Sequence, residues 1–67
     1  MTAEERAAYI NSQVACAMIK AMGMQAENQH RIACGNSVAY GEEAFVNLLT
    51  EYGIHHNAVM RLLQEGL

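Results

Sequence analysis

Residues 3–33 read AEERAAYINSQVACAMIKAMGMQAENQHRIA, a stretch with no proline and with Gly23 as its only glycine. Alanine, glutamate, methionine and glutamine are frequent in it, and all four are good helix formers. Thr2 and Glu5 have the spacing of a capping box, in which each side chain satisfies a free backbone N–H at a helix start. Because one glycine inside a helix costs only about 1 kcal/mol, we expect a single long helix over residues 3–33, with Gly23 as the one site for a bend.

Two shorter helices are predicted to follow the long one. Gly35 suits the left-handed residue that ends a helix, and Ser37 is a good N-cap for the next helix. The second helix is expected over residues 38–52 and the third over residues 56–65. Their apolar residues at helical spacing are expected to form the intramolecular core: Phe45, Leu48, Leu49, Tyr52, Ile54, Val59, Leu62 and Leu63.

The long helix carries a further apolar pattern, a coiled-coil seam whose residues alternate in spacing between three and four: Ala7, Ile10, Val14, Ala17, Ala21 and Met24. Between Val14 and Met24 it is apolar nearly all the way round, which indicates burial on more than one side. A chain this short buries only about 60% of the surface that its unfolded form exposes. We therefore expect residues 1–67 to form one all-α domain that a homodimer completes. The expected interface residues are Ala7, Ile10, Val14, Ala17, Met18, Ala21 and Met24.

Two alternatives stay open for the apolar side of this helix. It could serve a hetero-partner instead of a second copy, leaving an apolar patch on the free monomer. Met18, Met22 and Met24 could line a surface that adapts to varied partners, or they could fill a core or dimer interface. We favour the core or dimer interface for the methionines.

The cysteines and the termini indicate a soluble cytoplasmic protein. On one helix, Cys16 and Cys34 would lie about 27 Å apart, too far for a disulfide, and reduced thiols are typical of the cytoplasm. The N-terminus is net acidic, so we expect no secretory leader. The longest apolar run, residues 14–19, is far shorter than the ~20 residues of a membrane span, so we expect no membrane partner.

The segment of residues 45–64 resembles a helix-turn-helix, with Gly53 as the glycine of the turn. DNA binding depends largely on Lys and Arg at the phosphates, but residues 37–67 carry four glutamates against one arginine. DNA binding is therefore the alternative function, and we expect an ordinary packing unit with no nucleic-acid partner. The side chains that the third helix would offer to DNA are His56, Asn57, Arg61 and Gln64.

Metal binding and catalysis have weak support. Four potential ligands are present, His30, Cys34, His55 and His56, but no CxxC or HxxxH pair occurs, so we predict no metal and no cofactor. A nucleophile pair is available only as Cys34 with a histidine, and so short a chain has little interior for a dry pocket. We predict no catalytic residues and no enzyme.

Three segments carry a resemblance to a known group: MTAEERAAY at residues 1–9, QAENQ at residues 25–29 and EYGI at residues 51–54. The chain resembles the small helical proteins of unknown function encoded in the early regions of lambdoid phages, between the exonuclease and excisionase genes. The resemblance implies an accessory protein that influences phage development or host physiology in the cytoplasm of an infected or lysogenic bacterium. The expected function is thus a non-enzymatic protein–protein interaction module whose partners are a second copy and a host or phage protein.

Overall fold

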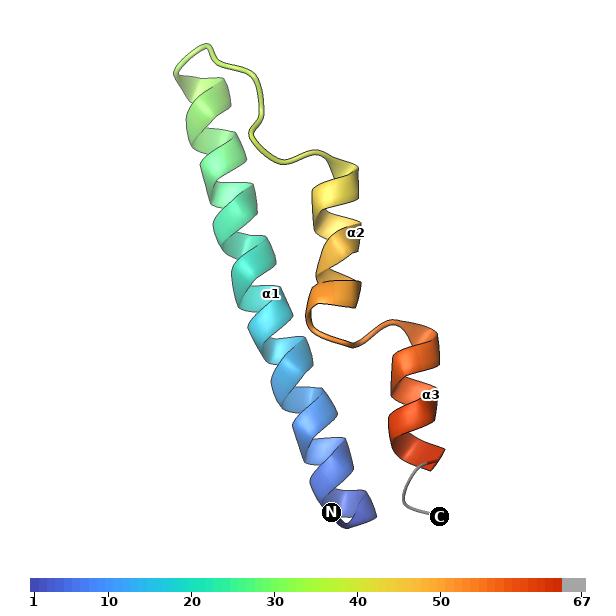
Figure 1. The fold of residues 1–67 in the computed structure, drawn as a ribbon. Helices are drawn as coiled ribbons and strands as arrows, with labels where there is room; N and C mark the ends of the chain where they lie inside the picture. The colour runs from blue at the N-terminus through green and yellow to red at the C-terminus, as the bar shows by residue number, and fades with distance from the viewer. Residues whose placement is uncertain (65–67) are drawn as a thin grey trace.

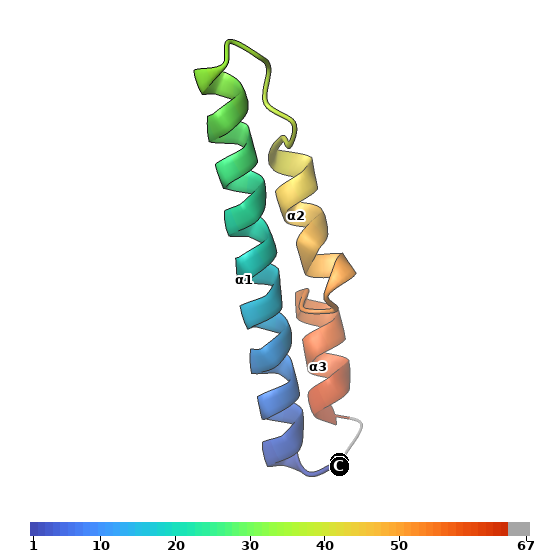
Figure 2. The ribbon, with the colours of Figure 1, turned by 90° about the vertical axis from the view of Figure 1, so that its left-hand side faces the viewer.

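The computed structural model describes residues 1–64, which contain three α-helices and no strand. Helix α1 spans Ala3–Ala33, α2 spans Glu42–Glu51 and α3 spans His56–Gln64. The two short helices lie one after the other along α1, and both run antiparallel to it (Figures 1 and 2). The chain is therefore all-α, as predicted, with one long helix and a two-helix arm. Homodimerisation stays a prediction.

Helix α1 begins and ends with the capping interactions that the sequence predicts. Thr2 Oγ1 accepts the Glu5 N–H at 3.0 Å, and Glu5 Oε1 accepts the Thr2 N–H at 3.0 Å. The backbone bond from Thr2 is the main reason that the pKa of Glu5 lies below its ordinary value. At the other end Gly35 has a φ of 81°, and the Asn36 N–H bonds the carbonyl of Arg31 at 2.8 Å. This is a Schellman motif, which satisfies carbonyls at the end of a helix.

Helix α2 begins later than predicted, at Glu42 instead of residue 38, and its N-cap is Gly41 instead of Ser37. The cause is the side chain of Asn28 on α1, whose Oδ1 accepts the backbone N–H groups of Ala39 and Tyr40 at 3.0 and 2.9 Å. These two backbone groups are held against α1 by side-chain bonds, so the connection stays non-helical until Gly41.

The two later helix boundaries lie close to the predicted ones. Helix α2 ends at Glu51, one residue before the predicted end, and Gly53 follows with a φ of 66°. Helix α3 begins at His56, as predicted, while its predicted last residue, Glu65, lies outside the described residues.

The core is small and lies between α1 and its arm. Its buried apolar residues are Ala17, Met24 and Leu48. Leu49 and Leu63, which we expected in the core, are exposed, because α1 covers only one face of each short helix. The other predicted core residues are half-buried: Phe45, Tyr52, Ile54, Val59 and Leu62.

The coiled-coil seam of α1 faces the arm of the same chain. Ala17 and Met24, predicted at a homodimer interface, are buried within the chain, and Ile10 and Ala21 are half-buried. The physical reason is that α2 and α3, laid end to end, cover the length of α1 that neither could cover alone (Figure 1). The predicted interface residues that remain exposed are Ala7, Val14 and Met18.

Candidate functional site

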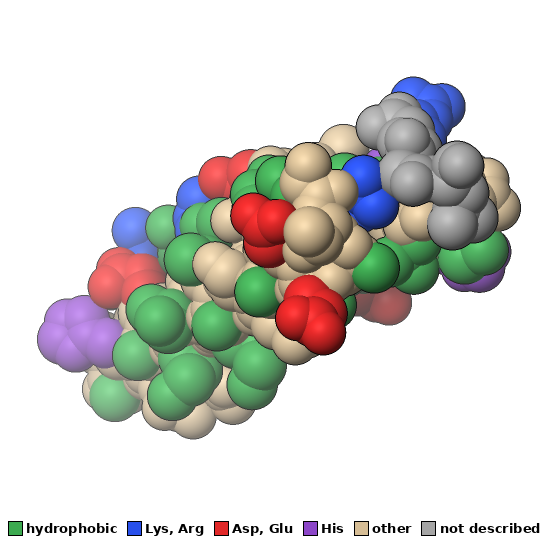
Figure 3. All heavy atoms as spheres, turned by 90° about the horizontal axis from the view of Figure 1, so that it is seen from below, with side chains coloured by type: hydrophobic (Ala, Val, Ile, Leu, Met, Phe, Trp, Pro, Cys, Tyr) green, Lys and Arg blue, Asp and Glu red, His purple; other side chains and the backbone are tan. Residues whose placement is uncertain are grey.

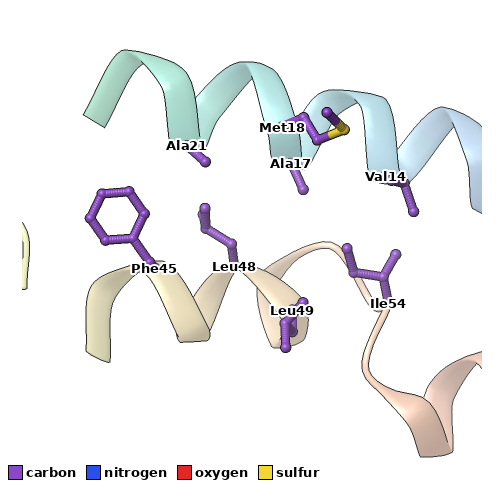
Figure 4. A pocket seen from close by; sticks show the side chains of 8 residues that line it. All are labelled: Val14, Ala17, Met18, Ala21, Phe45, Leu48, Leu49 and Ile54. Carbon is purple, nitrogen blue, oxygen red and sulfur yellow. The ribbon is translucent and has the colours of Figure 1, made fainter. Parts of the chain in front are cut away.

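An open apolar groove of about 320 Å³ follows the junction between α1 and α2. Helix α1 supplies Ala17 and Ala21 to its floor, and these point toward α2 (Figure 4). Because alanine is short, these positions leave space that a larger side chain would fill. Phe45, Leu48 and Ile54 point back toward α1 from the opposite side. The groove thus exists because small residues on one helix face large residues on the other.

The rim of the groove is apolar and open to solvent. It consists of Val14 and Met18 on α1 and Leu49 on α2, with exposed fractions of 37%, 60% and 44%. A space-filling view along the molecule shows apolar side chains forming much of the visible surface, with charged groups between them (Figure 3). Covering apolar surface of this kind is favourable by about 25 cal/mol per Å².

The opposite flank of the α1–α2 junction is polar and closed. Lys20 Nζ lies 2.8 Å from Glu51 Oε1, and the hydrogen bond that Lys20 donates to this carboxylate raises the pKa of Lys20. Gln13 Nε2 donates to the carbonyl of Tyr52 at 3.4 Å. Surface ion pairs add little stability, but these two contacts join the arm to α1 on this side. The two flanks of this junction therefore differ in kind: polar contacts close one of them, and exposed apolar side chains form the rim of the other.

The sequence prediction found part of this site. Val14, Met18 and Ala21 were expected at an interface with a partner, and they line the groove. Leu49 was assigned to the core and instead forms the rim. The sequence could have predicted this exposure of Leu49. Leu49 directly follows Leu48, and two adjacent residues on a helix do not point in the same direction, so both cannot face α1 equally.

The polar side chains proposed to contact DNA all lie at the surface of α3. His56, Asn57, Arg61 and Gln64 are exposed, and the last three share one face because they are four and three residues apart. However, α2 and α3 follow the same direction along α1 in both ribbon views. In a helix-turn-helix the two helices cross at about 90–120°. The arrangement therefore does not present α3 in the way that motif does.

The potential metal ligands do not converge. His30 Nε2 and Cys34 Sγ are 3.9 Å apart at the end of α1, whereas His55 lies before α3, where its Nδ1 accepts the Ala58 N–H at 3.3 Å. Among residues 1–64 no group of three or more metal-binding side chains occurs. Cys34 and His30 are both exposed, so they have no water-excluded surroundings in which to act as a nucleophile and base.

Comparison with known proteins gives no family for this chain: no protein-family model, curated protein or solved structure matches it. Within the described part of the chain, no helix combines the length and apolarity needed to cross a membrane. The groove and its rim are therefore the surface on which a functional proposal rests.

Proposed function

We propose that this protein is a non-enzymatic protein-interaction module that binds a protein helix through the groove and its rim. The observation that carries the proposal is the exposure of three apolar side chains, Val14, Met18 and Leu49, around one groove. Burying them against a partner removes them from water, which is the main favourable term in protein association.

The shape and lining of the groove favour a protein partner over a small molecule. Pockets for small molecules are about 300–1,000 Å³ and enclose most of the ligand around a few placed polar groups. This groove is at the lower end of that range, is open along its rim and is lined by apolar residues only. Apolar side chains on the surface of a helix match such a lining, and Met18 can adjust to their shape because methionine is flexible.

The resemblance to early-region proteins of lambdoid phages extends this proposal to a biological role. Under that extension the bound protein belongs to the host or the phage, and binding alters phage development or host physiology. The segments at residues 1–9, 25–29 and 51–54, which carry the resemblance, support this extension.

DNA binding through α3 is the alternative function, favoured by the shared exposed face of Asn57, Arg61 and Gln64. The distribution of charge opposes it, because Arg61 is the only Lys or Arg in residues 37–67. Phosphate contacts by such residues supply most of the affinity of non-specific DNA binding.

Capture from the lysate of the native host tests the proposed function with two matched variants. Met18→Glu puts a charge on the rim, whereas Cys16→Glu puts the same charge on the other side of α1, because residues two apart on a helix point in nearly opposite directions. We expect protein bound by the wild type to be retained by Cys16→Glu and lost with Met18→Glu. The absence of any protein with this pattern, a second copy of the chain included, would count against the proposal.

A further inference from the structure

We propose that a second copy of this chain occupies the groove side of α1, packed antiparallel around a twofold axis at Met18. The inference rests on the proposed function, because it names the partner of the same surface. It also moves the dimer interface from the coiled-coil seam, which the arm largely covers, to the neighbouring face of α1, which keeps Val14 and Met18 from the expected interface.

The first argument is the area that the single chain leaves exposed. Its accessible surface is 5055 Å² for a mass of 7.4 kDa. A compact monomer of this mass exposes roughly 4,200 Å² by the scaling of surface with mass. The excess of roughly 850 Å² is close to the ~800 Å² that each partner contributes to a stable interface of standard size. The chain therefore exposes, beyond what a compact monomer would, about as much surface as one partner of a dimer covers.

The second argument is a strip of uncharged residues along α1 beside the groove. The outer strip consists of Asn11, Val14, Met18, Met22 and Gln25, which are spaced by three, four, four and three residues and so follow one face of the helix. All five are exposed. Between residues 7 and 26 the one charged residue is Lys20, and it bonds Glu51 on the other flank. A partner helix can therefore cover the outer strip without burying a charge.

The third argument is that the outer strip has the same spacing in both directions from Met18. In an antiparallel pair centred there, Val14 lies against the partner's Met22, and Asn11 lies against the partner's Gln25. The apolar residues meet at the centre and the amides meet at both ends. Asparagine and glutamine side chains each contain a donor and an acceptor, so these end pairs can satisfy one another.

The antiparallel direction is favoured by the helices themselves. Two parallel copies of α1, each of 31 residues, would align their dipoles and place like partial charges side by side at both ends. Antiparallel packing pairs opposite ends instead. Because each arm already runs antiparallel to its own α1, the dimer would be a bundle of alternating helix directions, a common arrangement for helical bundles.

Sedimentation equilibrium of the purified protein at low micromolar concentration tests whether two copies bind each other through the outer strip. We expect a dimer for the wild type and for Cys16→Glu, and for Met18→Glu a dissociation constant at least 100-fold higher. A folded wild-type monomer overturns the inference, and a dimer that Met18→Glu leaves intact overturns its placement. A folded wild-type monomer would leave the proposed function in place with a host or phage protein as its partner, which the host-lysate capture decides separately.

Cross-linking tests whether the two α1 helices pack antiparallel, and it does not rely on a variant that weakens the dimer. In a Cys16→Ser, Cys34→Ser background, Asn11→Cys and Gln25→Cys proteins are mixed and treated with a short bis-maleimide, whose reach matches the about 8–10 Å between packed helices. We expect cross-linked dimers only in the mixture, because two copies of position 11 are about 21 Å apart in the antiparallel register. Cross-linking of Asn11→Cys alone would indicate a parallel pair and overturn the proposed geometry.

Discussion

The side chain of Asn28 binds the backbone of Tyr40 at both of its polar groups. Its Oδ1 accepts the Tyr40 N–H at 2.9 Å, and its Nδ2 donates to the Tyr40 carbonyl at 2.7 Å. The same Oδ1 also accepts the Ala39 N–H at 3.0 Å. These bonds join the inner face of α1 to the connection that follows it, and they determine where the chain turns back to form the arm.

Replacing Asn28 with alanine should loosen this connection. A typical hydrogen bond contributes a net 0.5–1.5 kcal/mol, and water can replace part of what is lost at a half-exposed site, so we expect Asn28→Ala to lower the free energy of unfolding by about 1–2 kcal/mol. Hydrogen exchange at the amides of Ala39 and Tyr40 should become faster. Asn47→Ala, at an exposed position of α2, is the control and should change stability little. Unchanged protection at Ala39 and Tyr40 would contradict the role of Asn28.

The sequence predicts the helices well because their signals are local. The capping box of Thr2 and Glu5 and the two positive-φ glycines are recognised from neighbouring residues alone. The start of α2 could not be predicted in this way, because Asn28 acts on Tyr40 across twelve residues and overrides Ser37 as an N-cap. The sequence also predicts the coiled-coil seam of α1. It does not predict which helix covers the seam, because the spacing is the same for a helix of the same chain and for a helix of a partner.

Leu48 is the residue of the arm on which the small core most depends. It is buried against α1, so Leu48→Ala should cost about 2–5 kcal/mol through lost burial and a cavity. In a protein of this size that loss would leave much of the chain unfolded at 25 °C. Val46→Ala, two residues earlier on the exposed side of α2, should cost less than 1 kcal/mol. Equal melting temperatures for the two variants, measured by circular dichroism, would show that Leu48 is misplaced.

The candidate site was only partly predictable, for a reason that lies in α1. The sequence shows that this helix is apolar on more sides than one partner can cover, and Val14 and Met18 follow from that observation. The volume of the groove depends on Ala17 and Ala21 lying opposite Phe45 and similar large residues. That pairing is set by the arm's position along α1, which the bonds of Asn28 determine.

The capping box should make stability depend on pH in a defined direction. Because the folded pKa of Glu5 lies below its ordinary value of 4.5, its contribution is present above that value and is lost as the pH falls through the folded pKa. The melting temperatures of the wild type and of Glu5→Gln should therefore differ at neutral pH and converge in acid. Glu4→Gln removes a neighbouring charge but no cap bond, and its difference from the wild type should vary less with pH. A Glu5→Gln difference independent of pH would contradict this assignment.

Tight DNA binding is not expected. Arg61 is the only Lys or Arg of α3, and α3 lies along α1 instead of projecting from α2. In a gel-shift assay with duplex genomic fragments at about 150 mM salt, near physiological ionic strength, we expect no submicromolar binding. Binding that weakens steeply with added salt, and that Arg61→Ala reduces, would favour the DNA-binding alternative over the protein-interaction module.

Two glycine-to-alanine substitutions should change stability in opposite directions. A Cβ built at Gly23 or at Gly35 meets no atom within 4 Å, so neither variant is limited by space. Gly23 lies inside α1, where alanine is favoured by about 1 kcal/mol, and this should raise the melting temperature by about 4–8 °C in a small domain. Gly35 has a φ of 81°, where a side chain costs about 1–2 kcal/mol, so Gly35→Ala should lower the melting temperature.

Thermal unfolding of the two variants beside the wild type checks both expected changes in melting temperature. A gain at Gly35 would mean that α1 does not end in the left-handed turn, and a loss at Gly23 would mean that the helix is interrupted there.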